Sequence, residues 1–241
     1  MSLLDGRVAV ITGSTRGLGR AMADAFAAEG ARIVVNGRNQ KDADDVAAAL
    51  PDALAIGGDM AAQRDVDDLV AQVRAAWGRI DILVNNAGIS RRSAITRVTD
   101  DEWDEVLRVN LTGPMRVTRA VIPLMKVQSR GAILNVISGA GTHGNVGFSF
   151  YAALKGGLVG LTMTWAQELA GFGIRVNALS PSALTDMMRQ LPPDVFASLE
   201  DRLPPPADIA GTALFLVSDL AKAVTGQIVA AGTGPTTSIS R

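Results

Sequence analysis

Residues 7–19, RVAVITGSTRGLG, contain the pattern from which the architecture of the chain can be inferred. The first six residues are mostly apolar and β-branched, which is typical of a short buried strand. A turn follows in which Gly13, Gly17 and Gly19 have the spacing GxxxGxG, and a helical pattern begins directly after it. Strand, turn and helix in this order bring free backbone N–H groups to a helix N-terminus, where a pyrophosphate can bind. Because glycine turns also serve as plain connections, this signal is weak when taken alone.

Short β-branched runs alternate with helical stretches along the rest of the chain. This alternation predicts a doubly wound α/β fold of the Rossmann type, with about seven mostly parallel strands and helices on both faces. No repeat or linker interrupts it, so we expect residues 1–241 to form one domain. Further strands are expected at 31–36, 53–59, 79–88, 130–138, 174–181 and 226–231, and helices at 21–30, 40–50, 65–77, 100–125, 151–170 and 207–219.

The composition argues against several classes of protein. The net charge of −1 gives no long-range attraction to nucleic acid or to an anionic membrane. The chain has no cysteine and one histidine, which argues against disulfides and transition-metal sites and fits a reducing compartment. No apolar run approaches the roughly 18 residues that cross a bilayer, and the start of the chain does not resemble a signal peptide. We therefore expect a cytoplasmic protein that binds no metal, nucleic acid or membrane.

The end of the second expected strand bears on the choice of dinucleotide. In many dinucleotide-binding sheets an acidic residue at this point holds the ribose 2′-hydroxyl. Here the strand ends in Asn36-Gly37-Arg38, without a carboxylate. Arg16 in the glycine turn and Arg38 could clamp a 2′-phosphate through charge-assisted hydrogen bonds, unless both are ordinary surface residues. Two positions that agree favour NADP(H) over NAD(H).

A second segment, 138–155, gathers three side chains suited to acid–base chemistry. Ser138 closes the apolar strand at 130–138, and a loop with four glycines leads from it to a helix. Tyr151 and Lys155 lie four residues apart and therefore share one face of that helix. Tyr151 is the only tyrosine in the chain, and without other clues a structural role would be the simplest interpretation.

The glycine turn, Asn85-Asn86-Ala87-Gly88, Asn110, Ser138 and Tyr151-x-x-x-Lys155 occur in this order, and with them the chain resembles the short-chain dehydrogenase/reductase family over nearly its whole length. Residues 80–180 are most similar to bacterial 3-oxoacyl-acyl-carrier-protein reductases and their paralogues. The resemblance implies that Asp59 contacts the adenine and that Asn85 lies beside the cofactor ribose. It implies cofactor contacts at Gly13, Ser14, Arg16, Gly17, Leu18, Gly19, Arg38, Asp59, Met60, Asn86, Ala87, Gly88, Tyr151, Lys155, Pro181 and Thr185.

The family's catalytic tetrad is matched by Asn110, Ser138, Tyr151 and Lys155. A free phenol has a pKa near 10, and we expect the Lys155 ammonium to lower that of Tyr151 so that it can act as general acid and base. Ser138 would orient the substrate oxygen, and Asn110 would hold a water that links Lys155 to solvent. Hydride then passes between the nicotinamide and a carbonyl or secondary alcohol carbon.

The sequence departs from the family pattern in three places. Ser182 stands where a glycine is usual, with one residue fewer before Thr185, and the expected substrate lid at 182–205 is shortened. Ala231 replaces an acidic residue near an edge that forms subunit contacts, so the implied homotetramer or homodimer could differ in its interface. Phe172 replaces an arginine that would help to receive an acidic carrier, which favours a smaller carbonyl or alcohol substrate.

Several alternatives stand beside an NADP(H)-dependent oxidoreductase. A P-loop ATPase would need Gly-Lys-Ser/Thr where the chain has Gly19-Arg20. A serine hydrolase would need a G-x-S-x-G elbow and a late histidine, whereas His143 follows Ser138 by five residues and is expected on the cleft wall. A catalytically silent NADP-binding regulatory or structural protein would usually have lost the tyrosine or lysine. Within the enzyme class, a 3-oxoacyl-acyl-carrier-protein reductase remains open.

Overall fold

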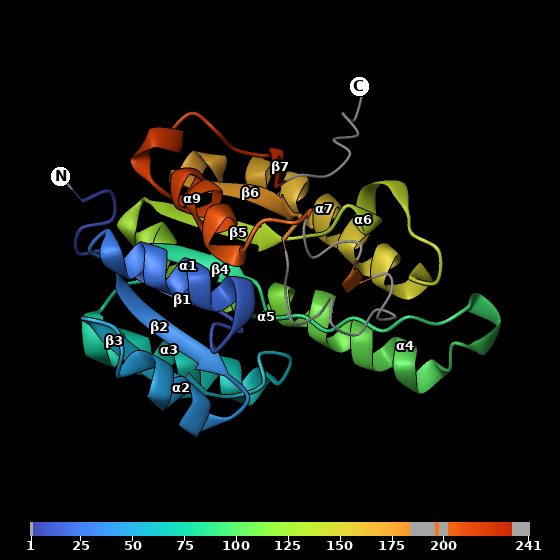
Figure 1. Cartoon of the computed structure of the whole chain (residues 1–241). Coiled ribbons are helices and arrows are strands. Elements are labelled where there is room, and N and C mark those ends of the chain that lie inside the picture. Colours follow the sequence, from blue (N-terminus) through green and yellow to red (C-terminus); the bar gives the residue numbers. More distant parts are fainter. Residues whose placement is uncertain (1, 184–195, 198–201, 233–241) are drawn as a thin grey trace.

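The computed structural model describes residues 2–183, 196–197 and 202–232. Seven parallel strands form one sheet in the order β3-β2-β1-β4-β5-β6-β7 (Figure 1). The predicted doubly wound α/β fold is therefore confirmed, and each strand falls within a few residues of its expected range. The strands are β1 (Val8–Ile11), β2 (Arg32–Gly37), β3 (Ala53–Gly57), β4 (Ile82–Asn85), β5 (Gly131–Val136), β6 (Ile174–Pro181) and β7 (Ile228–Ala231).

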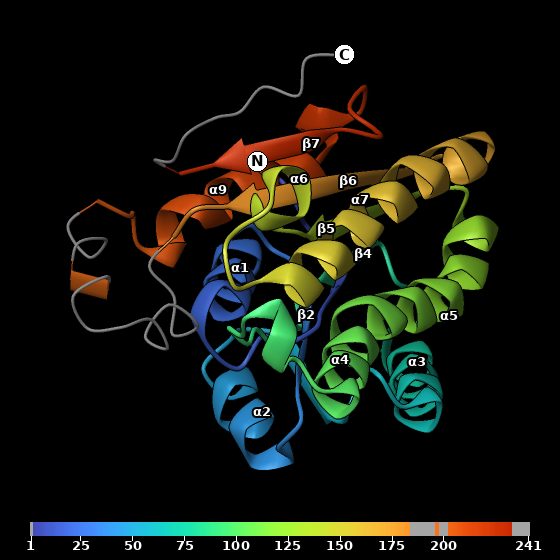
Figure 2. The same ribbon diagram turned by 90° about the vertical axis from the view of Figure 1, so that its right-hand side faces the viewer.

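Helices cover both faces of the sheet (Figure 2). On one face, α1 (Gly17–Ala28), α2 (Gln40–Ala47) and α9 (Pro206–Val217) pack on an apolar cluster that includes Phe26 and Leu134. On the other face, α3 (Gln63–Trp77), α5 (Gly113–Gln128) and α7 (Ser149–Leu169) pack on a second cluster. The central strands β1, β4 and β5 are buried along their whole length, which explains their continuous apolar sequences.

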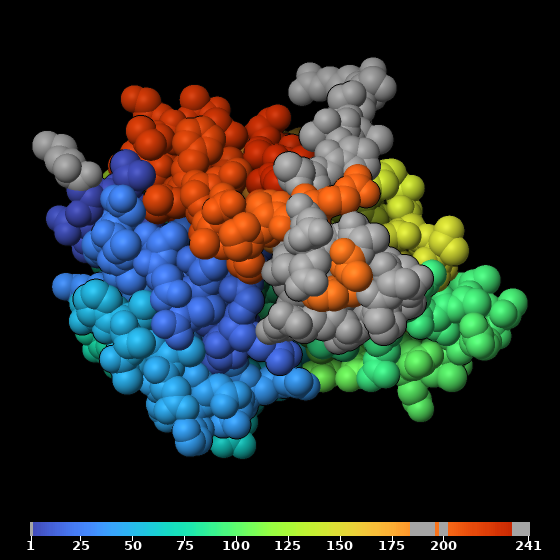
Figure 3. All heavy atoms as spheres, viewed as in Figure 1, coloured from blue at the N-terminus to red at the C-terminus, as the bar shows by residue number. Residues whose placement is uncertain are grey.

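The strand order places a ligand-binding crevice at the carboxyl ends of β1 and β4. From β1 the chain first builds β2 and β3 on one side, and β4 then pairs with the other side of β1. Loops that leave β1 and β4 therefore diverge in opposite directions and leave space between them. The loop after β4 and helix α4 (Asp100–Leu107) project from the body of the molecule beside this space (Figure 3).

The helix expected at 100–125 is interrupted, and the interruption lies at Asn110. A π-helical turn, Arg108–Thr112, separates α4 from α5, and the backbone N–H of Gly113 bonds to the carbonyl of Arg108. Pro114 has no N–H to donate to the carbonyl of Asn110, so a regular helix loses a bond at this point. The sequence pattern did not reveal this turn. Most of the lid expected at 182–205 lies outside the described residues.

Candidate active site

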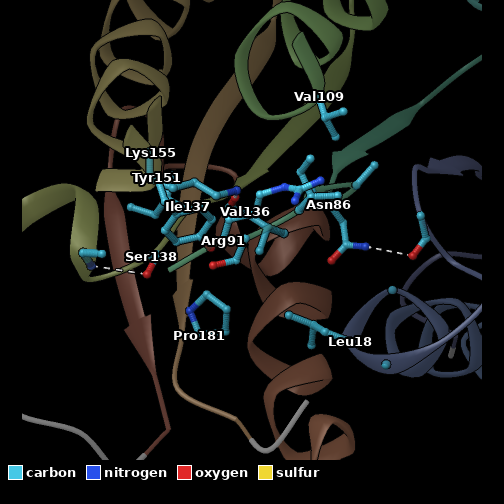
Figure 4. A pocket seen from close by; sticks show the side chains of 18 of the residues that line it. Leu18, Asn86, Arg91, Val109, Val136, Ile137, Ser138, Tyr151, Lys155 and Pro181 are labelled. Atoms are coloured by element: carbon cyan, nitrogen blue, oxygen red, sulfur yellow. Dashed lines mark hydrogen bonds between the residues drawn. The ribbon is translucent and has the colours of Figure 1, made fainter. Parts of the chain in front are cut away.

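The carboxyl ends of the strands open into a large cleft. Its volume is about 1190 Å³, and it runs from the glycine turn after β1 to the first turn of α7 (Figure 4). Ser14 and Asn110 do not line it, and Thr185 lies outside the described residues. The expected site residues that do line it are Gly13, Arg16, Gly17, Leu18, Gly19, Arg38, Asp59, Met60, Asn86, Ala87, Gly88, Ser138, Tyr151, Lys155 and Pro181.

The glycine turn packs so closely that side chains would not fit. A Cβ on Gly13 would lie 2.9 Å from the Cα of Ala87, and one on Gly19 would lie 2.3 Å from the carbonyl oxygen of Gly13. Helix α1 starts at Gly17 with no side-chain cap from Arg16 and no acidic residue in its first turn. Its first backbone N–H groups therefore lack helical partners, and the helix dipole favours an anion beside them. This cradle fits the pyrophosphate of a dinucleotide.

Two hydroxyl side chains hold the turn in place instead of lining the cleft. The Oγ1 of Thr12 accepts the backbone N–H groups of Asn86 and Ala87, both at 3.0 Å. The Oγ of Ser14 donates to the last carbonyl of β1 at 2.7 Å and accepts the N–H of Asn36 at 3.0 Å. Ser14 is fully buried, so its side chain joins β1 to β2 and does not face a ligand.

The far end of the cleft lies beside the end of β2. The buried Asn36 side chain donates to the carbonyl of Ile56 at 3.0 Å and is thereby held within the sheet. Beside it, the Thr15 methyl group lies over Gly37, where a Cβ would come within 2.6 Å. No carboxylate is present at the end of β2, and the exposed side chains of Arg16 and Arg38 both line the cavity.

Asp59 is held in place at the position expected to meet the adenine. Its carboxylate accepts the N–H of Ala61 at 2.9 Å and a hydrogen bond from Arg108. Partial burial raises the pKa of this carboxyl, but the hydrogen bonds from Arg108 and Ala61 and the charge of Arg108 outweigh burial and leave the pKa below its ordinary value. Asp59 is therefore an ionised acceptor that faces the cleft.

Tyr151 reaches the cleft from the first turn of α7, beside Ser138 at the end of β5. Burial raises the pKa of the Tyr151 phenol to about 12, and a hydrogen bond with Ser138 opposes part of this rise. The Oγ of Ser138 also accepts the N–H of Ala140 at 3.2 Å (Figure 4). The expected lowering of the phenol pKa is not what the structure shows. The phenol is neutral at physiological pH and so can donate a proton.

Lys155 lies one turn further along α7 and is almost fully buried, with 4% of its surface exposed. Its Nζ donates to the carbonyl of Val136 at 2.7 Å and lies 5.7 Å from the centre of the Tyr151 ring. Burial lowers the pKa of Lys155 to about 8. The lysine is therefore close to the point at which it can either hold or release a proton.

Asn110 lies behind this pair, in the π-helical turn. Its Nδ2 donates to the carbonyls of Ile89 at 2.9 Å and Val106 at 3.0 Å. Its buried Oδ1 has no hydrogen-bond partner in the described part of the chain. A Cβ on Gly88 would lie 2.7 Å from this Oδ1 and 3.7 Å from the Nζ of Lys155. An unpaired acceptor and the lysine thus border the same glycine, which fits the expected proton link.

The two asparagines after β4 have different roles, which the sequence did not separate. Asn85 is buried, and its Nδ2 donates to Thr118 of α5 at 3.0 Å and to Asn135 of β5 at 2.8 Å; it does not line the cleft, although it was expected beside the cofactor ribose. Asn86 lines the cleft, and its Nδ2 donates to the carbonyls of Thr12 at 2.9 Å and Gly13 at 3.0 Å (Figure 4). Asn86 therefore joins the turns after β1 and β4.

The substrate half of the cleft contains residues that sequence reasoning did not name. Arg91 and Glu105 form an ion pair of 2.6 Å there, and Phe148 meets the Tyr151 ring edge-on with the ring centres 6.2 Å apart. The segments around these residues carry no motif that would have marked them. His143 was expected on the cleft wall but is not among the lining residues; it ends α6 (Ala140–His143), and its ring packs against Gly139.

Among residues 2–183, 196–197 and 202–232, no group of three or more histidine or acidic side chains is arranged to hold a metal ion. Over the same ranges, none of the helices combines the length and apolarity that crossing a membrane requires.

Comparison with known proteins agrees with this geometry. The family model described as short chain dehydrogenase matches residues 7–195. A 3-oxoacyl-acyl-carrier-protein reductase of Thermotoga maritima is 40% identical over 94% of this chain and 96% of its own length. A protein of the same name from Synechocystis sp. is 41% identical over 94% of this chain and 96% of its own length. Another, from Escherichia coli K12, is 35% identical over 92% of this chain and 94% of its own length. The chain therefore belongs to the short-chain dehydrogenase family.

Proposed function

We propose that this chain is an NADP(H)-dependent oxidoreductase that reduces the 3-oxo group of a 3-oxoacyl compound, with Tyr151 as general acid. The observation that carries the proposal is geometric: the half-buried side chain of Tyr151 lines the cleft together with Ser138, and the buried Lys155 lies on the next helical turn. The 3-oxoacyl class is proposed because the relatives reported above bear that name.

Each residue of the tetrad has a distinct task in this proposal. Ser138 donates a hydrogen bond that orients the substrate carbonyl oxygen. Tyr151 gives its proton to that oxygen as the carbonyl carbon is reduced, and Lys155 can restore the proton because burial brings its pKa to about 8. Asn110 completes the path through its unpaired Oδ1. NADPH, when bound, supplies the hydride.

The residues of the cleft fit NADPH better than NADH. The cradle at Gly13 and Gly19 would hold the pyrophosphate, and Arg16 and Arg38 would bind the 2′-phosphate through charge-assisted hydrogen bonds. At the end of β2, Asn36 and Gly37 provide no carboxylate to repel that phosphate.

Two further expectations are proposed together with the activity. Residues 1–241 act as one domain in the cytoplasm. The protein forms a homotetramer or homodimer, which is supported by exposed apolar side chains on α4, α5, α7 and α9 (Trp103, Val127, Met163 and Phe215). Light scattering of the purified protein tests the assembly, and a monomer would contradict it.

The test of the activity is direct. Protein, NADPH and acetoacetyl coenzyme A are mixed, and the absorbance of the reduced nicotinamide is followed, with NADH in a parallel reaction. Turnover with a higher kcat/KM for NADPH than for NADH supports the proposal. NADPH binding without turnover of any 3-oxoacyl compound would favour the silent alternative, against which the presence of both Tyr151 and Lys155 argues.

A further inference from the structure

An arginine at the mouth of the cleft has no task in the proposed reaction. The side chain of Arg92 packs on Gly147, where a Cβ would lie 3.1 Å from its Cγ and 3.2 Å from its Nε. The N–H of Ser93 donates to the carbonyl of Gly147 at 2.9 Å. Gly147 precedes Tyr151 by four residues, so these contacts hold Arg92 beside the start of α7.

The charges in this half of the cleft do not balance. Arg91 and Arg92 line it, whereas Glu105 is the only carboxylate there among the described lining residues. Glu105 is already paired with Arg91 at 2.6 Å. Arg92 is exposed and makes no hydrogen bond or ion pair within the part of the chain that the structure describes. A cleft lined by one sign of charge attracts ligands of the other.

The cofactor does not account for Arg92. Its phosphates are assigned to the N-terminus of α1 and to Arg16 and Arg38, which lie in the part of the cleft formed by β1 and β2. Arg92 belongs to the loop after β4 and contacts the segment before Tyr151. The group that meets Arg92 therefore belongs to the other reactant.

We propose that Arg92 binds an anionic group of the substrate and so selects a carbonyl compound that carries a carboxylate or a phosphate. This inference rests on the proposed function, because it names the substrate class of the same site. A guanidinium presents two parallel N–H donors and can bind either anion in a bidentate manner. The anion could be the carboxylate of a short 3-oxo acid or a phosphate on the carrier arm of a 3-oxoacyl thioester.

The test compares four substrates that differ in charge. Acetoacetate carries a carboxylate and acetoacetyl coenzyme A carries phosphates, whereas ethyl acetoacetate and acetoacetyl-N-acetylcysteamine are neutral. Each is assayed with the wild type, with Arg92→Met and with Arg97→Met. Arg97 is an exposed arginine of the same loop that does not line the cleft, which makes its variant the matched control.

The expected result is a KM about tenfold higher or more in Arg92→Met for a charged substrate, because a charge-assisted hydrogen bond is lost. The kcat, the KM of the neutral compounds and the Kd of NADPH should stay unchanged, and Arg97→Met should match the wild type. A loss confined to acetoacetate identifies a carboxylate, and a loss confined to acetoacetyl coenzyme A identifies a phosphate.

Two results overturn the proposal in distinguishable ways. If Arg92→Met alters charged and neutral substrates equally, or alters none, the role of Arg92 is refuted while the proposed function stands. If the wild type reduces none of the four compounds, the proposed function fails and the assignment of Arg92 fails with it.

Discussion

Replacement of Lys155 by methionine should change how the stability of the protein depends on pH. Lys155 is almost completely buried, and burial lowers its pKa from 10.5 to about 8. Below about pH 8 the ammonium is present in both the folded and the unfolded chain, so folding bears the full cost of burying the charge. Methionine keeps the length of the side chain and carries no charge at any pH.

The size of the effect follows from the difference between the two pKa values. As the pH rises from about 8 to about 10.5, the folded protein releases its proton before the unfolded chain does, and the cost of burial disappears. A pKa that is lower by about 2.5 corresponds to about 3 kcal/mol. About 2 kcal/mol of this should appear between about pH 8 and pH 10. The raised pKa of Tyr151 removes stability only above about pH 10, outside this window.

The assay is urea unfolding followed by the fluorescence of the three tryptophans, at one protein concentration and several pH values. The free energy of unfolding of the wild type, minus that of Lys155→Met, should rise by about 2 kcal/mol between about pH 8 and pH 10. Lys222→Met, which replaces an exposed lysine, serves as control, and the difference between its free energy of unfolding and that of the wild type should stay constant. If the difference between the wild type and Lys155→Met also stays constant with pH, the lowered pKa of the buried Lys155 is refuted.

Three other predictions concern the cofactor site and the pH dependence of activity. Arg38→Ser should raise the Kd of NADPH by about tenfold or more and leave the Kd of NADH unchanged, because one charged contact to the 2′-phosphate is lost. Nicotinamide fluorescence measures both Kd values, and equal effects on the two cofactors would contradict the assignment. Gly19→Ala should abolish NADPH binding, since its Cβ would lie 2.3 Å from the carbonyl oxygen of Gly13. Gly160→Ala is the control, because the added carbon meets nothing within 4 Å. It should leave NADPH binding intact and stabilise α7 by up to about 1 kcal/mol. The kcat for reduction should decline above about pH 8, where Lys155 loses the proton that it passes to Tyr151, and a profile that stays flat to pH 10 would count against that role.

The sequence predicted the sheet well because its signals are local. Each strand is a short apolar run, and in the central strands burial on both faces of a parallel sheet produces that pattern. The glycine turn could be placed for the same reason, since the close approach of Gly13 to Ala87 admits no side chain. The candidate tetrad was named from the spacing of Ser138, Tyr151 and Lys155 and from the resemblance to a family, and its catalytic role stays a prediction.

The features that could not be predicted depend on contacts between distant segments. The π-helical turn at Asn110 has the same apolar pattern as a continuous helix, and only Pro114 hints at a break. The direction in which the pKa of Tyr151 is shifted was missed, because burial outweighs the hydrogen bond with Ser138. Burial cannot be read from the spacing of residues in the sequence. The place of Arg92 depends on the packing of its side chain on Gly147, more than fifty residues away in the sequence.

The most direct test of the account is the rate of hydride transfer in Tyr151→Phe. This variant keeps the ring that packs against Phe148 and removes only the phenolic oxygen. In a single turnover with bound NADPH and acetoacetyl coenzyme A, the rate should fall by about 10²- to 10⁴-fold, while the Kd of NADPH stays within about twofold of the wild type. A variant that binds NADPH normally and reduces the substrate at the wild-type rate would contradict the central claim that Tyr151 is the proton donor.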